Sequence, residues 1–229
     1  MLRNNGAKAT FFTVGNRISG NGVDTVKREV AEGHQVATHT WDHAAGDGQS
    51  VNLSYMSAEQ QREEVTKGFQ AIEDATGQKP SFVMRAPGGN FPTEVWSNVE
   101  DLVVADIGWD VDTTDWKRPE ASRIAAELMR VTPGDIVLMH DGGGNRENTI
   151  EGLRIALPKL VQDGWKFVTI DELMNTLQRQ LKKAGAAHFS NAAPSGQFKL
   201  RAFYSMPAKN AFPAGVTERA LARRPPSSR

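Results

Sequence analysis

The chain has 229 residues, a formal net charge of zero and no cysteine. This length holds one α/β domain with a sizeable core, and the lack of cysteine excludes disulfides, thiolate metal sites and cysteine nucleophiles. Residues 1–174 carry 17 Lys and Arg against 26 Asp and Glu, so the end of the chain is basic. An acidic body argues against nucleic acid as a partner. We predict no membrane span and no signal peptide, because no apolar run has the length or position of either.

Short apolar runs alternate with polar stretches of helical periodicity, which is typical of parallel β/α units. Ser57 and Gln60 form a capping-box pattern, and Gly33 and Gly77 suit the ends of helices. The predicted strands are 9–14, 35–38, 81–84, 103–107, 135–139 and 166–169. The predicted helices are 23–32, 58–76, 93–101, 120–130, 149–163 and 171–180.

Both ends of the sequence depart from this alternation. Residues 1–6 read as the last turn of a helix stopped by Gly6, whereas a β/α unit should begin with a strand. We therefore expect an N-terminal strand to be missing. After about residue 178 the periodicity stops, so we predict one domain over 1–178 and a basic, disordered tail over 179–229.

Unusual polar residues follow four of the predicted strands. The segment HTWDH (39–43) follows one strand, Arg85 ends the next, DVDTTDW (110–116) follows a third and His140 follows a fourth. The carboxyl ends of strands in β/α barrels and open α/β sheets are where active sites assemble. The sequence therefore predicts one shared site.

His39 and His43 are spaced so that two imidazoles can hold one divalent cation. Two surface histidines are the alternative, and the position after a strand favours the metal. A zinc-protease motif is excluded because Thr40, not Glu, follows the first histidine.

Arg85 begins the segment RAPGG, and a buried arginine at a strand end normally pairs with a carboxylate. The Gly88 amide can serve as an oxyanion donor, with an ordinary tight turn as the alternative. Of the nearby acidic residues 110, 112 and 115, we expect at least one to be merely solvated. Trp116 either stacks on a sugar ring or belongs to the core.

His140 emerges from a buried strand into a run of glycines, where it can give or take protons. With Asp115 as its orienting partner, we interpret His140 as catalytic.

The segments HTWDH, RAPGG, DTTDW and LMH, in this order and spacing, resemble four of the five motifs of the NodB-like polysaccharide deacetylases, the fourth family of carbohydrate esterases. KATFFTVG and GWKFVTIDEL resemble the family's flanking strands, so the resemblance covers residues 3–175. It implies an α/β fold of the distorted, incomplete (β/α) barrel type. The implied chemistry is removal of acetyl groups from N-acetylglucosamine polymers or acetylated xylan.

Carried over to this chain, the resemblance assigns a role to each motif residue. His39 and His43 become metal ligands, for zinc or for cobalt or another divalent ion, and Arg85 orients the catalytic base. The remaining roles are an oxyanion amide from Gly88, tuning of the general acid His140 by Asp115, and walls of the acetyl pocket from Trp116 and Leu138.

The family's first motif, Thr-Phe-Asp-Asp-Gly, supplies the general base and the third metal ligand and is not in this sequence. We expect a deacetylase of peptidoglycan or chitin-type polymers that the loss of this motif impairs, with acetylxylan as the alternative substrate. A second hypothesis is an inactive carbohydrate-binding pseudoenzyme whose basic tail adheres to anionic wall polymers. An unrelated metal hydrolase, such as an amidohydrolase, would need further ligands at other strand ends, and none is evident. The resemblance implies an extracellular or cell-wall location, and no oligomeric state is predicted.

Overall fold

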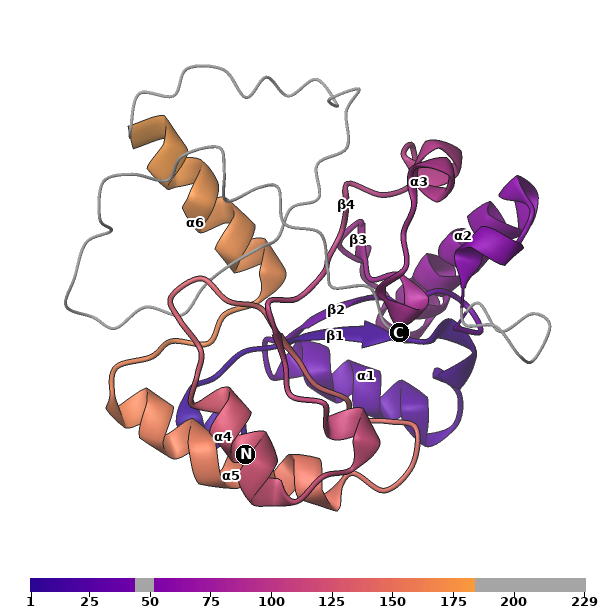
Figure 1. Ribbon diagram of the computed structural model, residues 1–229. Helices are drawn as coiled ribbons and strands as arrows, with labels where there is room; N and C mark the ends of the chain where they lie inside the picture. Colours follow the sequence, from indigo (N-terminus) through magenta and orange to yellow (C-terminus); the bar gives the residue numbers. More distant parts are fainter. Residues whose placement is uncertain (44–51, 184–229) are drawn as a thin grey trace.

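The computed structural model describes residues 1–43 and 52–183 of the chain (Figure 1). In these residues, short strands form two parallel sheets, one with the order β1-β2-β3-β4 and one in which β5 pairs with β6. The fold is therefore α/β, as the sequence predicts. The strands are β1 (Thr10–Thr13), β2 (Gln35–Thr38), β3 (Val83–Met84), β4 (Ala105–Asp106), β5 (Val111–Asp112) and β6 (Val137–Leu138).

Helices follow most of the strands and cover both sheets (Figure 1). The α-helices are α1 (Asn21–Ala31), α2 (Ala58–Thr76), α3 (Thr93–Val99), α4 (Ala121–Leu128), α5 (Glu147–Gln162) and α6 (Ile170–Lys183). Single 3-10 turns are η1 (Arg3–Asn5), η2 (Gly15–Arg17), η3 (Leu53–Tyr55), η4 (Pro87–Gly89) and η5 (Asp115–Lys117). None of the helices in the described ranges has the length and apolar character of a membrane span.

Alternating side chains give the larger sheet two buried faces. On β3, Met84 points into a cluster with Phe69 of α2 and Val95 of α3. Its neighbour Val83 points the other way, into a cluster with Leu173 of α6. The sheet is therefore covered by α2 and α3 on one face and by α6 on the other, which explains why its strands are short apolar runs.

The smaller sheet is covered by α4 and α5, which pack against each other (Figure 1). Ile124 of α4 has no exposed surface and lies against the backbone side of α5 at Gly152, where a Cβ atom would lie 2.7 Å from the Ile124 side chain. Val111 of β5 and Val137 of β6 pack onto the same cluster. This close helix pair fixes the two strands whose ends carry Asp115 and His140.

Most predicted elements are confirmed, and the differences are at sheet edges. The capping box of Ser57 and Gln60 is present, and Gly77 ends α2 with a φ of 68°. Residues 166–169, predicted as a strand, are not assigned to one, although the Phe167 carbonyl accepts a hydrogen bond from the Lys8 amide. Conversely, β5 lies in a stretch that the sequence pattern predicts as a loop, because acidic residues are untypical of a strand. Its pairing with β6 identifies it as a strand.

The proposed tail begins inside a helix, since α6 continues to Lys183. The rest of the predicted tail, from residue 184, lies outside the described residues.

All the strand pairs are parallel, so the carboxyl ends of the strands within each sheet point the same way. The turn that follows β2 is packed tightly against α2. A Cβ atom at Gly68 would clash with Thr38 Oγ1 and would lie 3.1 Å from the Thr40 carbonyl carbon. Only glycine at this position lets the turn approach the helix.

We therefore predict that Gly68→Ala lowers the free energy of unfolding by about 1–3 kcal/mol, although alanine is the better helix former. Urea unfolding followed by circular dichroism measures the change. Thr66→Ala, on the exposed side of the same helix, is the control and should be neutral or slightly stabilising. Greater stability of Gly68→Ala would contradict the packing argument.

Candidate active site

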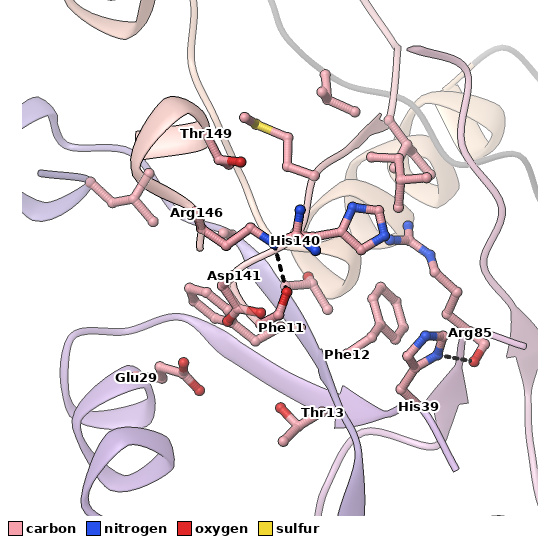
Figure 2. Close-up of a pocket in the computed structure, with 18 of the residues that line it drawn as sticks. Phe11, Phe12, Thr13, Glu29, His39, Arg85, His140, Asp141, Arg146 and Thr149 are labelled. Carbon is pink, nitrogen blue, oxygen red and sulfur yellow. Dashed lines mark hydrogen bonds between the residues drawn. The ribbon is translucent and has the colours of Figure 1, made fainter. Parts of the chain in front are cut away.

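A cavity of about 880 Å³ runs along β1 and β6, from residues before each strand to the histidines that follow β2 and β6 (Figure 2). Its lining includes His39, His43, Arg85, Leu138 and His140. In Figure 2, the side chains of Arg85, His39 and His140 gather around the ring of Phe12. The structure thus brings the predicted metal ligands and the predicted proton donor to one place.

The two histidines after β2 present ring nitrogens to each other. His43 Nε2 lies 3.1 Å from His39 Nε2, and His39 Nδ1 lies 2.7 Å from the Arg85 carbonyl oxygen. A carbonyl only accepts, so His39 Nδ1 carries the proton and donates it, which leaves the lone pair on Nε2. The two Nε2 atoms therefore lie close together beside the cavity.

The backbone between the two histidines is strained and held in place. Thr40 has a φ of 68° and is completely buried, and His43 has a φ of 71°. Such angles are costly for residues other than glycine and persist only where the surroundings impose them. Here Glu64 Oε2 of α2 accepts hydrogen bonds from the amides of Trp41 and Asp42, at 3.0 and 3.1 Å. The helix therefore fixes the geometry of the turn between His39 and His43.

Glu64 has a positioning role that the sequence analysis does not identify. Its side chain is buried, and it lies on the same face of α2 as the core residues Val65 and Ile72. A charged residue on the apolar face of an amphipathic helix was the available signal.

His39 and His43 are neutral at neutral pH. Burial lowers the pKa of His39 to about 4. The hydrogen bond to the Arg85 carbonyl raises this pKa, but its effect is smaller. Burial also lowers the pKa of His43, and the charge of His140 contributes to the lowering for both rings. A neutral imidazole is the form that binds a metal.

Arg85 joins the end of β3 to the crossover between the two sheets. Its Nε donates to the Ile107 carbonyl at 2.8 Å and its Nη2 to the Gly108 carbonyl at 3.1 Å. Its guanidinium carbon also lies 4.3 Å from the centre of the Phe12 ring. Burial lowers the pKa of Arg85 to about 10, and the nearby Asp106 acts in the opposite direction. Arg85 therefore stays charged at neutral pH beside the cavity.

Asp115 and His140 form the second half of the site. His140 Nδ1 donates to Asp115 Oδ1 at 2.8 Å, and the His140 amide donates to Asp115 Oδ2 at 2.8 Å. Thr149 at the start of α5, which the sequence analysis does not identify, donates its hydroxyl to Asp115 Oδ2 at 3.0 Å. Burial raises the pKa of Asp115, but these bonds and the His140 charge outweigh it, so the pKa lies below its usual value.

The ring of His140 is held on one edge and open on the other. The Asp115 side chain is completely buried, whereas the His140 side chain is 36% exposed. Since Nδ1 faces the carboxylate, Nε2 is the nitrogen left to exchange a proton with a ligand in the cavity. This is the geometry of a carboxylate-oriented acid or base.

The other predicted site residues are placed differently from one another. Leu138 of β6 lines the cavity, whereas Gly88 and Trp116 are not among its lining residues. Gly88 lies in η4 with a φ of 64°. Trp116 is 50% exposed, so it is not part of the core. Asp110 and Asp112 accept hydrogen bonds from the amides of residues 136 and 114, so both stabilise local backbone.

The donor set at the cavity suits a divalent cation. Two nitrogens bound tetrahedrally to zinc at roughly 2.0–2.1 Å lie roughly 3.3–3.4 Å apart, and the His39–His43 separation of 3.1 Å is close to this. Residues 1–43 and 52–183 contain no group of three or more His, Cys, Asp or Glu side chains placed to hold a metal. Among the described residues, His39 and His43 are the two that would hold a cation here.

A family model described as polysaccharide deacetylase matches residues 1–105. A peptidoglycan-N-acetylglucosamine deacetylase of Bacillus cereus is 32% identical over 177 residues, covering 76% of this chain and 78% of that protein. The chain belongs to the polysaccharide deacetylase family. A chitooligosaccharide deacetylase of a Bradyrhizobium species is also 32% identical, covering 72% of this chain and 77% of the relative.

Other relatives of this polysaccharide deacetylase family member are longer. A peptidoglycan-N-acetylglucosamine deacetylase of Listeria monocytogenes is 38% identical over 173 residues, covering 75% of this chain, which spans only 34% of that protein.

Solved structures share the fold, which confirms the predicted family architecture. A Bacillus anthracis protein described as a CE4 family pseudoenzyme is 34% identical with a TM-score of 0.65, covering 75% of this chain and 57% of that one. A family 4 acetyl xylan esterase of Clostridium thermocellum, in complex with a cobalt ion, is 27% identical with a TM-score of 0.65, covering 80% and 82%.

Glu29 of α1 is a buried carboxyl group that lines the same cavity. It lies apart from Arg85 and the histidines in Figure 2 and is 8% exposed, and its Oε2 has no hydrogen-bond partner among the described residues. Burial, and secondarily the charge of Asp141, raises the pKa of Glu29 to about 7. The folded protein therefore holds this proton over a pH range in which the unfolded chain releases it.

We predict that Glu29→Gln stabilises the protein at high pH only. The pKa of Glu29 in the fold, about 7, exceeds its ordinary 4.5, so wild-type stability falls as pH rises between these values and the loss is complete above pH 7. The variant should gain up to about 2 kcal/mol at pH 8 and almost nothing at pH 4. Urea unfolding at both pH values measures the difference, and an equal effect at both would disprove the raised pKa.

Proposed function

We propose that this chain is a metal-dependent deacetylase that hydrolyses N-acetyl groups of a polysaccharide of the peptidoglycan or chitin type. The observation that carries the proposal is the convergence of His39 Nε2 and His43 Nε2, 3.1 Å apart, on the cavity that His140 also lines. Hydrolysis of an amide needs a polarised carbonyl, an attacking water that gives up a proton, and a proton for the leaving nitrogen. The two halves of the site match the first and the third of these needs.

His39 and His43 would hold the cation, zinc or another divalent ion. When bound, the cation would polarise the acetyl carbonyl and lower the pKa of a water molecule. His140, with its Nδ1 held by Asp115, would give its Nε2 proton to the amine nitrogen as the C–N bond breaks. The ionised Asp115 stabilises the charged imidazole before this transfer.

The relatives support the substrate class and the place of action. The matched proteins from Listeria and Bacillus cereus are named for peptidoglycan N-acetylglucosamine, and that from Bradyrhizobium for chitooligosaccharides. Peptidoglycan and chitin share the N-acetylglucosamine unit. We therefore propose this unit as the reacting sugar and the cell wall or cell exterior as the place of action, with acetylxylan as the alternative substrate in view of the Clostridium neighbour.

A second candidate is a protein that binds carbohydrate without hydrolysing it. The structural neighbour from Bacillus anthracis is described as a pseudoenzyme, and the described residues supply two metal ligands rather than the usual three of catalytic zinc. Acetate release separates the two candidates.

We predict that the chain releases acetate from chitin or peptidoglycan oligomers and that Asp115→Asn lowers kcat by about 10²–10⁴-fold. The amide would offer N–H to the His140 ring instead of accepting from it. Asp112→Asn is the matched control, because an amide oxygen can still accept the bond from the Thr114 backbone. Retention of oligomers on the protein without acetate release would favour the binding protein.

We predict that Zn²⁺ binds the wild-type chain and binds His39→Gln and His43→Gln at least about tenfold more weakly. Titration calorimetry measures the affinity. His34→Gln is the control, because His34 lies at the opposite end of β2 and accepts a bond from the Ala9 amide. Equal Zn²⁺ affinity in all four proteins would disprove the metal site at His39 and His43, whether or not the protein releases acetate.

A further inference from the structure

Three basic side chains belong to the two loops that meet at His140, and we name them the cationic rim: Lys117, Arg118 and Arg146. Arg146 lines the cavity, and Arg118 Nη2 lies at the carbonyl of Gly143, which also lines it. Lys117 and Arg118 lie two and three residues after Asp115. Arg146 Nη1 donates to the Asp115 carbonyl at 3.1 Å, so Arg146 joins the two loops that hold the proton donor.

Two guanidinium groups of the rim meet at one acceptor. Arg118 Nη2 and Arg146 Nη2 each lie 3.4 Å from the Gly143 carbonyl oxygen, so the two nitrogens are no more than twice that distance apart. Arg118 also packs over Gly144, where a Cβ atom would meet its guanidinium. Two like charges so close repel each other unless an anion lies between or beside them.

No described carboxylate forms an ion pair with any of the three rim residues. The acidic residues nearest to the rim in the sequence interact with other groups. Asp115 is buried and accepts a hydrogen bond from His140, and Glu147 accepts one from the Asn145 side chain. The charge of Asp141 raises the pKa of Glu29. Arg146 also donates its Nε to the Gly142 carbonyl at 2.6 Å, so its guanidinium binds neutral acceptors only. The rim charges are thus not neutralised by a described carboxylate.

The rim also offers a surface for a sugar ring. Trp116 lies between Asp115 and Lys117 in η5 and is 50% exposed, and Lys117 Nζ sits 4.8 Å from the centre of its ring. An exposed indole is a platform on which sugar rings stack. Here the platform and three positive charges adjoin the proton donor.

The rim differs in charge from the rest of the body. Residues 1–174 carry 17 basic against 26 acidic residues, so a polyanion gains little attraction elsewhere on the described surface. A positive cluster at the mouth of a site raises the local concentration of anionic ligands and orients them. Planar guanidinium groups match the geometry of a carboxylate in particular.

We infer that the cationic rim binds a carboxylate carried by the glycan beside the sugar that loses its acetyl group. The chain then selects a carboxylate-bearing polymer, such as alternating N-acetylglucosamine and N-acetylmuramic acid, over neutral chitin. The inference rests on the proposed function and narrows its substrate class.

The test compares three oligomers of similar length: the alternating glycan with free carboxylates, the same glycan with its carboxylates amidated, and chitin. The readout is kcat/KM for acetate release at low salt. We expect wild type to prefer the free carboxylate over the amidated form by about tenfold, mainly through KM. Arg118→Gln should reduce this ratio to near one.

Arg123→Gln is the matched control, because Arg123 is an exposed arginine on α4 without a described ion pair. It removes the same charge and should leave the ratio as in wild type. A wild-type ratio near one would overturn the inference, and so would an unchanged ratio in Arg118→Gln. An equal loss on all three oligomers would show a structural role for Arg118 instead.

Failure of the proposed function has a different signature, namely no acetate from any oligomer with the wild-type chain. Titration calorimetry with the same three oligomers then decides the inference alone. Tighter binding of the free-carboxylate glycan than of its amidated form, lost in Arg118→Gln, supports the rim. Equal affinities overturn it.

Discussion

A buried carboxylate holds the candidate active site together. Asp115 has no exposed surface, and burying a charge is costly unless hydrogen bonds compensate it. Its donors come from His140, through both ring and amide, and from Thr149 of α5. The fold therefore keeps its stability only when the loop after β5, the end of β6 and the start of α5 meet in one arrangement. That arrangement leaves His140 Nε2 facing the cavity, ready for proton transfer.

A second buried carboxyl group, on α2, holds a turn of the larger sheet in place through hydrogen bonds. Glu64 of α2 accepts two amides from the turn between His39 and His43. These two hydrogen bonds offset the strain of that turn, in which Thr40 has a φ of 68°. Arg85 then joins the two halves, because its guanidinium binds the carbonyls of the crossover between the sheets. His39 and His43 thus reach the same cavity as His140 from different sheets.

Much of this arrangement was predictable from the sequence, since local patterns carry it. Apolar runs and helical periodicity locate β1, β2 and most helices, and the capping box at Ser57 locates the start of α2. One element was missed and one was wrongly predicted, for the same reason. β5 is short and acidic but pairs with β6, whereas residues 166–169 have the composition of a strand but form no ladder. Hydrogen-bond partners rather than composition decide both cases.

The sequence by itself determined which chemical groups are present and that they follow strands: the imidazoles of His39, His43 and His140, and the carboxylate of Asp115. Only the tertiary structure decided their distances and protonation. The 3.1 Å approach of two Nε2 atoms, the lowered pKa of His39 and the meeting of Arg118 and Arg146 at one carbonyl all arise between distant segments. Burial and contacts between distant segments set these properties, and the local sequence pattern predicts neither of them.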